Sequence, residues 1–360
     1  MRRRRLLRAL PAAALPAVAG CLGDGSDGTV TSPPEPTSQS TPPTTSKPDG
    51  PTGVYVQSYR EGMAMFGPVT NGDFTFGLML AVPHDFWTVT GTEREAKKKT
   101  DEHAVHLMAQ VWHEESGQVL ADTSLSVEIL QDGELVSEEV IYPMLSQRMG
   151  FHYGGNFTLA GDGSYTAKLS VAGLQIGRMG SFADKFAEPT TAEVDFEFTK
   201  QVRDKLTIQE LDAAGDKGAI RPMQMGDMPV GLAPKPDALP GTTIGTERVD
   251  DADLVAKYVE GGRFAGSGES YLYVSARTPY NDLLLPMMGL DALVRDGQTK
   301  FDGQLSRAVD PDLSYHYGAT VPSLQSGDEV EIEVVVPPQV ARHEGYERAF
   351  LQMDGATYVI

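Results

Sequence analysis

Two stretches of this 360-residue chain repeat one pattern at a spacing of 164 residues. The first, residues 131–155, reads QDGELVSEEVIYPMLSQRMGFHYGG, and the second, residues 295–319, reads RDGQTKFDGQLSRAVDPDLSYHYGA. Each stretch places a turn glycine 19 positions before a His-Tyr-Gly motif, and the turn glycines Gly163 and Gly327 keep the same offset. Because an internal repeat indicates one supersecondary unit used twice, the chain is predicted to contain two related domains.

Apolar or alternating runs of strand length fill both halves of the chain and are separated by turn signals such as NGD and QDGE. Only residues 251–260, DADLVAKYVE, suggest about two turns of helix. This pattern favours an all-β fold with two Ig-like antiparallel β-sandwich domains in tandem. We expect the first sandwich over residues 53–200, a Met/Pro-rich connector over 201–244, and a second sandwich, a degenerate repeat, over 245–360.

The N-terminus has the composition of an export signal. Residues 1–20 combine an arginine-rich start with a short Ala-rich apolar stretch, which predicts a signal peptide, of a kind that resembles twin-arginine signals. Residues 18–21, VAGC, resemble a lipobox, which makes Cys21 the lipidated first residue of the mature protein. Residues 21–52 are rich in Pro, Ser and Thr and predict a disordered tether. We therefore expect an exported protein that Cys21 anchors to the outer face of the cell membrane.

The charge balance excludes one class of partner. Asp and Glu total 50 against 30 Lys and Arg, a formal net charge of −20. Since phosphate backbones are bound through Lys and Arg, we expect no nucleic acid partner. An acidic chain with few lysines is also typical of halophilic archaea, and an unpaired single cysteine excludes an intrachain disulfide.

Soft metal donors gather in the first half of the chain. In VHLMAQVWH, strand alternation puts His106 and Met108 on one face. If the segment YPMLSQRMGFHYGGN folds over that face as an edge loop, Met144 and His152 reach the same place. Imidazole and thioether together suit copper, and Cu(I) in particular. The structural alternative is that these methionines fill gaps in an ordinary core.

The segments VHLMAQVWH, YPMLSQRMGFHYGGN and GDGSYTAKLSV resemble the periplasmic iron(II)-transport-associated proteins, across residues 53–200. The resemblance implies an Ig-like metal-binding protein that accompanies a membrane iron permease. It also implies a site made of a His-x-Glu pair on a strand, a Met after Pro, the His of the HYG motif and a later His. By motif, His106, Met144 and His152 occupy three of these positions.

This sequence departs from the family pattern in three places. Met108 stands where the family has Glu, and Met179 stands where the later His is expected. Met144 and His152 are one residue further apart than expected, so Met149 is an alternative thioether. Because sulfur replaces harder donors, the expected ion shifts towards Cu(I), with iron as the other metal to consider.

These features lead to a functional prediction with open alternatives. We expect a copper-binding, membrane-anchored protein that supports iron(II) uptake with a permease, and not an enzyme, although a redox role of the metal stays open. The alternatives are a metal-free Ig-like surface interaction module and a copper chaperone unconnected to iron. The protein either forms a homodimer or does not, and this stays open. His316 of the second repeat is expected to be structural. The connector's methionines either deliver Cu(I) or pack between domains: Met223, Met225 and Met228.

Overall fold

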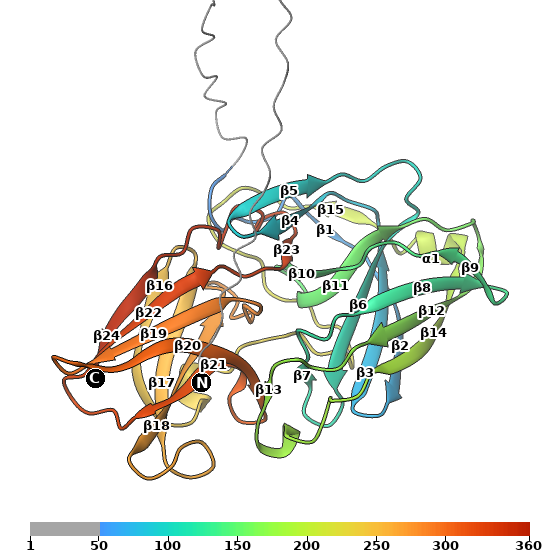
Figure 1. The fold of residues 1–360 in the computed structure, drawn as a ribbon. Coiled ribbons are helices and arrows are strands. Elements are labelled where there is room, and N and C mark those ends of the chain that lie inside the picture. The colour runs from blue at the N-terminus through green and yellow to red at the C-terminus, as the bar shows by residue number, and fades with distance from the viewer. Residues whose placement is uncertain (1–50) are drawn as a thin grey trace, which may run out of the picture. The chain divides into compact units, whose positions relative to one another are not determined.

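The computed structural model describes residues 51–360, and this part of the chain is almost entirely β-structure (Figure 1). The predicted signal peptide, Cys21 and most of the predicted tether lie outside the described residues. The fold class is as predicted: antiparallel sheets stack as β-sandwiches. Within residues 51–360, no helix is long and apolar enough to cross a membrane.

The first sandwich has a large and a small sheet. The large sheet runs in the order β2-β3-β6-β11-β10-β23-β4-β5, with β7 paired to β6, and the small sheet in the order β14-β12-β8-β9. The bounds are β2 Ala64–Asn71, β3 Phe74–Ala81, β4 Phe86–Thr90, β5 Glu93–Lys97, β6 Val105–His113, β7 Gln118–Val119, β8 Ser126–Gln131, β9 Glu134–Ser137, β10 Tyr142–Ser146, β11 Gly150–Phe157, β12 Gly163–Val171, β14 Thr190–Phe198 and β23 Ala341–Arg342.

The second sandwich follows the order β16-β17-β18-β21-β20-β19-β22-β24, with β13 paired to β20. Strand β20 belongs to both layers of this sandwich. Its first half pairs with β19 up to Leu305, and its second half pairs with β21 from Ser306. The bounds are β13 Gly177–Arg178, β16 Thr242–Val249, β17 Ala252–Glu260, β18 Glu269–Arg277, β19 Gly289–Arg295, β20 Thr299–Asp310, β21 Ser314–Pro322, β22 Glu329–Val336 and β24 Gly355–Val359.

Short elements complete the fold. Strand β1 (Tyr59–Glu61) pairs with β15 (Ile208–Glu210), which lies in the predicted connector. The helix α1 (Lys200–Arg203) begins at Thr199, whose side chain accepts a hydrogen bond from the Val202 amide as an N-cap. Two 3-10 turns occur at Gly180–Phe182 and Pro236–Ala238.

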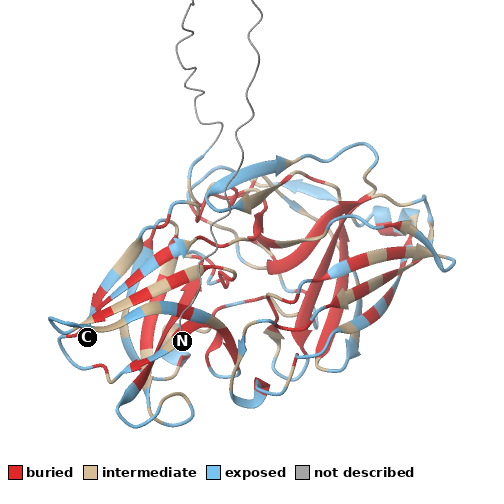
Figure 2. Cartoon of the chain, in the orientation of Figure 1, coloured by how far each residue is buried: buried red, intermediate tan, exposed pale blue. Residues whose placement is uncertain are grey.

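Burial distinguishes the two sheets of the first sandwich. Strands β12 and β14 alternate between buried and less buried residues, as strands with one solvent face do. In contrast, every residue of β3, β6 and β11 is buried, and these strands are buried along their whole length in Figure 2. Their second face is therefore covered by other parts of the chain, and that covered face carries the soft donors.

The two sandwiches exchange short strands. Strand β23 of the second half pairs in parallel with β10 of the first, with Met144 opposite Ala341. Strand β13 of the first half pairs in parallel with β20 of the second, with Gly177 opposite Ala308. Both exchanges follow the 164-residue offset, and Figure 1 shows each short strand beside its distant partner. The exchange is thus reciprocal within one chain.

Two local predictions are wrong. Residues 252–260 form strand β17 in place of a helix, and the segment after Tyr142 is the β10–β11 hairpin, inside the sheet, in place of an edge loop. In both cases pairing with neighbouring strands outweighs the local pattern.

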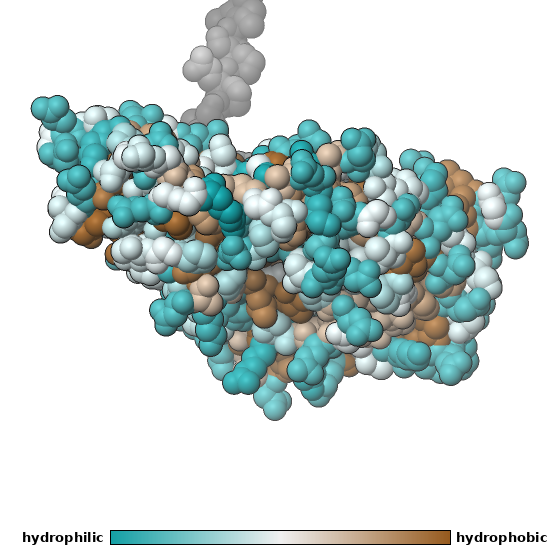
Figure 3. Space-filling view, turned by 90° about the horizontal axis from the view of Figure 1, so that it is seen from below, coloured by the Kyte–Doolittle hydropathy of each residue, from teal (hydrophilic) through white to brown (hydrophobic). Residues whose placement is uncertain are grey.

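The face of the molecule seen in Figure 3 is mostly hydrophilic and carries only limited apolar areas, as the acidic composition leads one to expect.

Candidate metal centre

Strand register brings the predicted donors of β6, β10 and β11 onto one face. In these antiparallel pairs, Asn156 lies opposite His106 and Gly154 lies opposite Met108. In the adjoining pair, Met144 lies opposite His152. Since directly opposed residues share a face of the sheet, His106, Met108, Met144 and His152 point to the same side. All four are buried.

Two further histidines complete the group. His343 directly follows β23, and its ring centroid is 5.1 Å from that of His152 and 5.4 Å from that of His106. His84 precedes β4, and its ring centroid is 4.1 Å from that of His106. One ring nitrogen from each of His84, His106 and His343 lies within 4.8 Å of the others. His152 is outside this tight trio.

Hydrogen bonds at Nδ1 fix how the histidine rings are oriented. His152 Nδ1 is 3.0 Å from the Gly150 carbonyl oxygen, and His106 Nδ1 is 2.9 Å from Asn156 Oδ1. These oxygens only accept, so each Nδ1 carries the proton and donates. Asn156 is itself oriented by its Nδ2, which donates to the His84 carbonyl at 3.0 Å.

His84 plays the same orienting role for His343. His84 Nδ1 donates to the Val82 carbonyl at 3.0 Å, so His84 Nε2 accepts from His343 Nδ1, also at 3.0 Å. Glu61 adds a carboxylate 3.9 Å from His84 Nδ1. Because His84 Nε2 is engaged, His84 fits better as the support of a ligand than as a ligand itself.

Three Nε2 atoms are left with bare lone pairs. Among the described residues, Nε2 of His106, His152 and His343 is buried and has no hydrogen-bond partner. A buried polar atom without a partner is costly, and such atoms call for an explanation. Binding of a metal ion by these nitrogens is one explanation. A neutral imidazole whose other nitrogen donates to an acceptor is the usual form of a histidine ligand.

Burial keeps these imidazoles neutral. It lowers the pKa of His152 to about 4, and it lowers the pKa values of His106 and His343 well below the ordinary 6.5. Repulsion from His84 acts in the same direction on all three. The neutral form is the one that binds metal.

Gly154 leaves room beside these nitrogens. A Cβ atom at Gly154 would lie 2.9 Å from Met144 Sδ, 3.0 Å from His106 Nε2 and 3.5 Å from Met108 Cγ. The missing side chain therefore opens a space onto which a thioether and an imidazole converge. The residues present thus fit a soft metal ion: unpaired imidazole nitrogens, an adjacent thioether and a space between them.

Met108 and Met149 line a small cavity of about 10 Å³, which is close to the space that a single water occupies. His84 and His343 line the same cavity, together with Met63. Five of the six predicted side chains thus lie around one region: His106, Met108, Met144, Met149 and His152.

Met179 does not belong to this group, which corrects its predicted placement. It packs in the second sandwich against Tyr271 and Tyr273, and its Sδ is 3.5 Å from the Tyr271 hydroxyl. The reason is the strand exchange, which carries the segment after β13 to the other sandwich.

The equivalent place in the second sandwich is filled. His316 Nδ1 donates to the Ser314 carbonyl at 3.0 Å, as His152 does to Gly150, but His316 Nε2 accepts from the Tyr271 hydroxyl at 3.0 Å. Tyr271 also occupies the space beside Gly318, the counterpart of Gly154. The prediction that His316 is structural is confirmed by these hydrogen bonds.

Sequence reasoning missed His343 and His84. The repeat offset held the signal for His343, since Met179 plus 164 gives position 343, and Gly177-Arg178-Met179 matches Ala341-Arg342-His343. At this place of the repeat the candidate centre therefore contains His343, which the second half of the chain supplies, and not the predicted Met179. His84 carried no comparable signal, because its role depends on contact with a residue 259 positions away.

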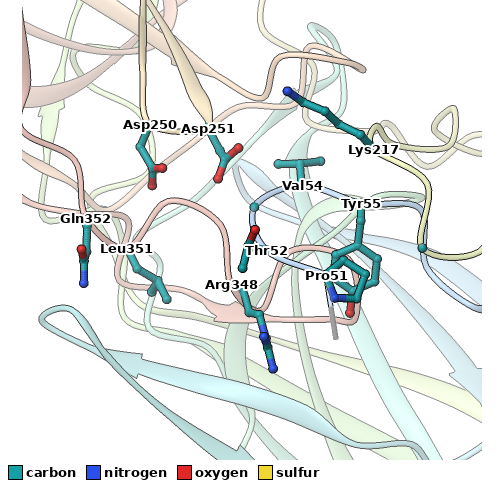
Figure 4. Close-up of a pocket in the computed structure, with 12 residues that line it drawn as sticks. Pro51, Thr52, Val54, Tyr55, Lys217, Asp250, Asp251, Arg348, Leu351 and Gln352 are labelled. Atoms are coloured by element: carbon teal, nitrogen blue, oxygen red, sulfur yellow. The ribbon is translucent and has the colours of Figure 1, made fainter. Parts of the chain in front are cut away.

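A larger cavity of about 570 Å³ lies elsewhere, where the described chain begins. Figure 4 shows the acidic side chains of Asp250 and Asp251 on one wall, apart from Lys217 and Arg348. Burial raises the pKa of both Asp residues. No histidine or methionine of residues 51–360 lines this cavity, so its chemistry does not suit a soft metal.

Parts of the chain are similar to a domain family and to solved structures. A domain of unknown function (DUF7350) matches residues 237–359, and no curated protein matches the chain. FetP of uropathogenic E. coli strain F11, in its as-isolated form, is a similar solved structure, with 19% identity, a TM-score of 0.31, and coverage of 38% of this chain and 96% of that one. A copper-bound variant of FetP has 18% identity, a TM-score of 0.30, and coverage of 39% and 93%.

Proposed function

We propose that this protein is a copper-binding protein of the cell exterior, anchored to the membrane, that supports iron(II) uptake with a membrane permease. The observation that carries the metal-binding part is the set of three buried imidazole Nε2 atoms, in His106, His152 and His343, without hydrogen-bond partners in residues 51–360. Each has its Nδ1 committed to an acceptor, so each lone pair is available for an ion.

The chain's own residues would hold the ion with nitrogen and sulfur. The Nε2 atoms of His106, His152 and His343 and Sδ of Met144 are the proposed ligands, and Met108 or Met149 is an additional thioether. Asn156 and His84 orient His106 and His343, and they hold the protons on Nδ1. The bound metal would supply a redox-active cation, and the soft donor set favours Cu(I) over iron.

Metal binding can be tested with a matched pair of double variants. In Met144→Leu with His152→Gln, the affinity for Cu(I), measured by competition with a Cu(I) chelator, should fall by at least about 100-fold. The control, Met353→Leu with His316→Gln, changes the same residue types in the second half of the chain and should bind as the wild type does. Equal affinities in the two double variants would remove the proposed site.

The cellular part of the proposal comes from the sequence and its resemblance to iron(II)-transport-associated proteins. Cys21→Ala should release the protein from the membrane fraction, and deletion of the gene should slow growth when iron(II) is limiting. The soft donors favour one competing function, a copper chaperone unconnected to iron. That function predicts a growth defect that follows copper supply and is insensitive to iron.

A further inference from the structure

A row of methionines crosses the large sheet of the first sandwich and ends at the candidate metal centre. In neighbouring antiparallel strands, Met65 lies opposite Met79, Met79 opposite Met108, and Met108 opposite Gly154. Directly opposed residues share a face, and neighbouring strands are about 4.8 Å apart. The row therefore runs from β2 to β11 in short, even steps, and its last position is the space beside Met144 Sδ and His106 Nε2.

Exposure falls along this row. Met65, in the edge strand β2, is 42% exposed, whereas Met79 and Met108 are buried. The row thus has one end at the solvent and the other at the buried histidines.

A second set of methionines covers the row. Met225 and Met228 of the connector form a bridge with each other and are buried in the same cluster, with Met149 as a further member. Met228 is placed by Gly77 in β3, because a Cβ there would lie 2.5 Å from Met228 Sδ. Further thioethers therefore pack in one cluster with the buried part of the row, Met79 and Met108.

Ordinary packing does not account for this concentration. Five of the seven buried residues in this cluster are methionine, and Met63 and Met223 pack against it. In the main hydrophobic core of residues 51–360, by contrast, Met288 and Met353 are the only buried methionines. If methionine served only to fill gaps, it would be expected in both places.

Gln110 is an independent sign that the cluster accommodates a polar or charged species. It lies on the same strand face as Met108, opposite Gly77, and is fully buried. Among the described residues, neither its amide oxygen nor its amide nitrogen has a hydrogen-bond partner. Such an amide is costly in an apolar cluster, but its carbonyl dipole would stabilise a monovalent cation that enters.

We propose that Met65, Met79 and Met108 form a path along which Cu(I) passes from solvent to the histidine centre by exchange of thioether ligands. The ligands are neutral and the copper stays Cu(I) throughout, so no oxidant, reductant or proton is required. This inference rests on the proposed function and adds to it the route by which the centre is loaded. The path needs Met79, because Met65 and Met108 are separated by two strand spacings, about 10 Å.

The test compares the rate of loading with the final affinity. Wild type, Met79→Leu, Met65→Leu and the control Met353→Leu are mixed with Cu(I) stabilised in acetonitrile, and free Cu(I) is trapped by a chelator after set times. Leu replaces Met at nearly constant volume, so the fold should be retained. Loading of Met79→Leu and Met65→Leu should be about ten-fold slower than that of the control. Equilibrium affinity, from chelator competition, should be the same in all four proteins.

The outcomes separate the path from the site. If wild type retains Cu(I) and both path variants load at the control's rate, the path is wrong and the histidine centre stands. If wild type retains no Cu(I), the proposed function fails and the path fails with it. Should Met79→Leu not fold, as judged by circular dichroism, the exposed Met65→Leu variant alone decides between these outcomes.

Discussion

Gly154 is the residue whose missing side chain defines the candidate centre. Its backbone does not adopt a positive φ, so alanine is tolerated there, but the new Cβ would enter the space between Met144 Sδ and His106 Nε2. Gly154→Ala should therefore weaken Cu(I) binding by at least about ten-fold, through blocked access to these donors. The free energy of unfolding should change by only about 1 kcal/mol, since the Met144 side chain is able to shift.

Gly231→Ala is the matched control, because a Cβ there meets Val119 at an ordinary 3.6 Å. Chelator competition gives the affinity and urea denaturation gives the stability of both variants. Unchanged Cu(I) affinity in folded Gly154→Ala would mean that the ion does not use this space.

At the scale of elements, the exchanged strand β23 decides which donors meet. It is held in the first sandwich by pairing with β10 and β4, and the buried Arg342 donates to the carbonyls of Val340 and Pro338. A metal bound by His343 and by the β6, β10 and β11 donors would therefore link the two halves of the chain. Binding to the folded state alone stabilises it, by about 3 kcal/mol at a free ligand concentration 100 times Kd.

Cu(I) should thus raise the unfolding midpoint of the wild type, and His343→Gln should remove most of that gain. Met179→Leu, at the equivalent position of the other exchanged segment, should keep it. Thermal unfolding with and without Cu(I) measures the difference. An equal shift in His343→Gln and wild type would exclude His343 as a ligand.

The elements also show how far the sequence can be read. Alternation in VHLMAQVWH correctly put His106 and Met108 on one face, because the period of a strand is a local property. The local apolar pattern also predicted a helix over residues 251–260, but these residues form β17, which pairs with β16 on one side and β18 on the other. Pairing partners far along the chain are not visible in a ten-residue window, so such errors are expected where the local pattern is weak.

At the scale of the whole molecule, the 164-residue repeat predicted two related domains, and the strand registers of the two halves match at this offset. Met144 opposite His152 and Ala308 opposite His316 are the same pair in the two copies. The repeat did not reveal that a short strand of each copy pairs in the sheet of the other copy. Such an exchange depends on how the two copies pack, and it has no signal in the periodicity of the sequence. That gap explains both the misplaced Met179 and the missed His343.

The whole molecule should also lose stability in mild acid, because its buried histidines stay neutral. His316 is fully buried, and burial lowers its pKa from the ordinary 6.5 to about 4. Between pH 6.5 and pH 4 this histidine is protonated in the unfolded chain but stays neutral in the folded chain. The free energy of unfolding is therefore retained above pH 6.5 and falls as the pH approaches 4. For His316 alone the loss is about 2 kcal/mol between pH 7 and pH 5.

His316 is suited to the measurement because its hydrogen bonds are to Ser314 and Tyr271, outside the candidate centre. Urea denaturation of metal-free wild type and His316→Gln at pH 7 and pH 5 gives the two pH dependences. The variant should be less stable at both values, but its loss between them should be smaller than that of the wild type by about 2 kcal/mol. Equal losses would mean that His316 is protonated in the folded protein at pH 5, which its burial and its hydrogen bond from Tyr271 oppose.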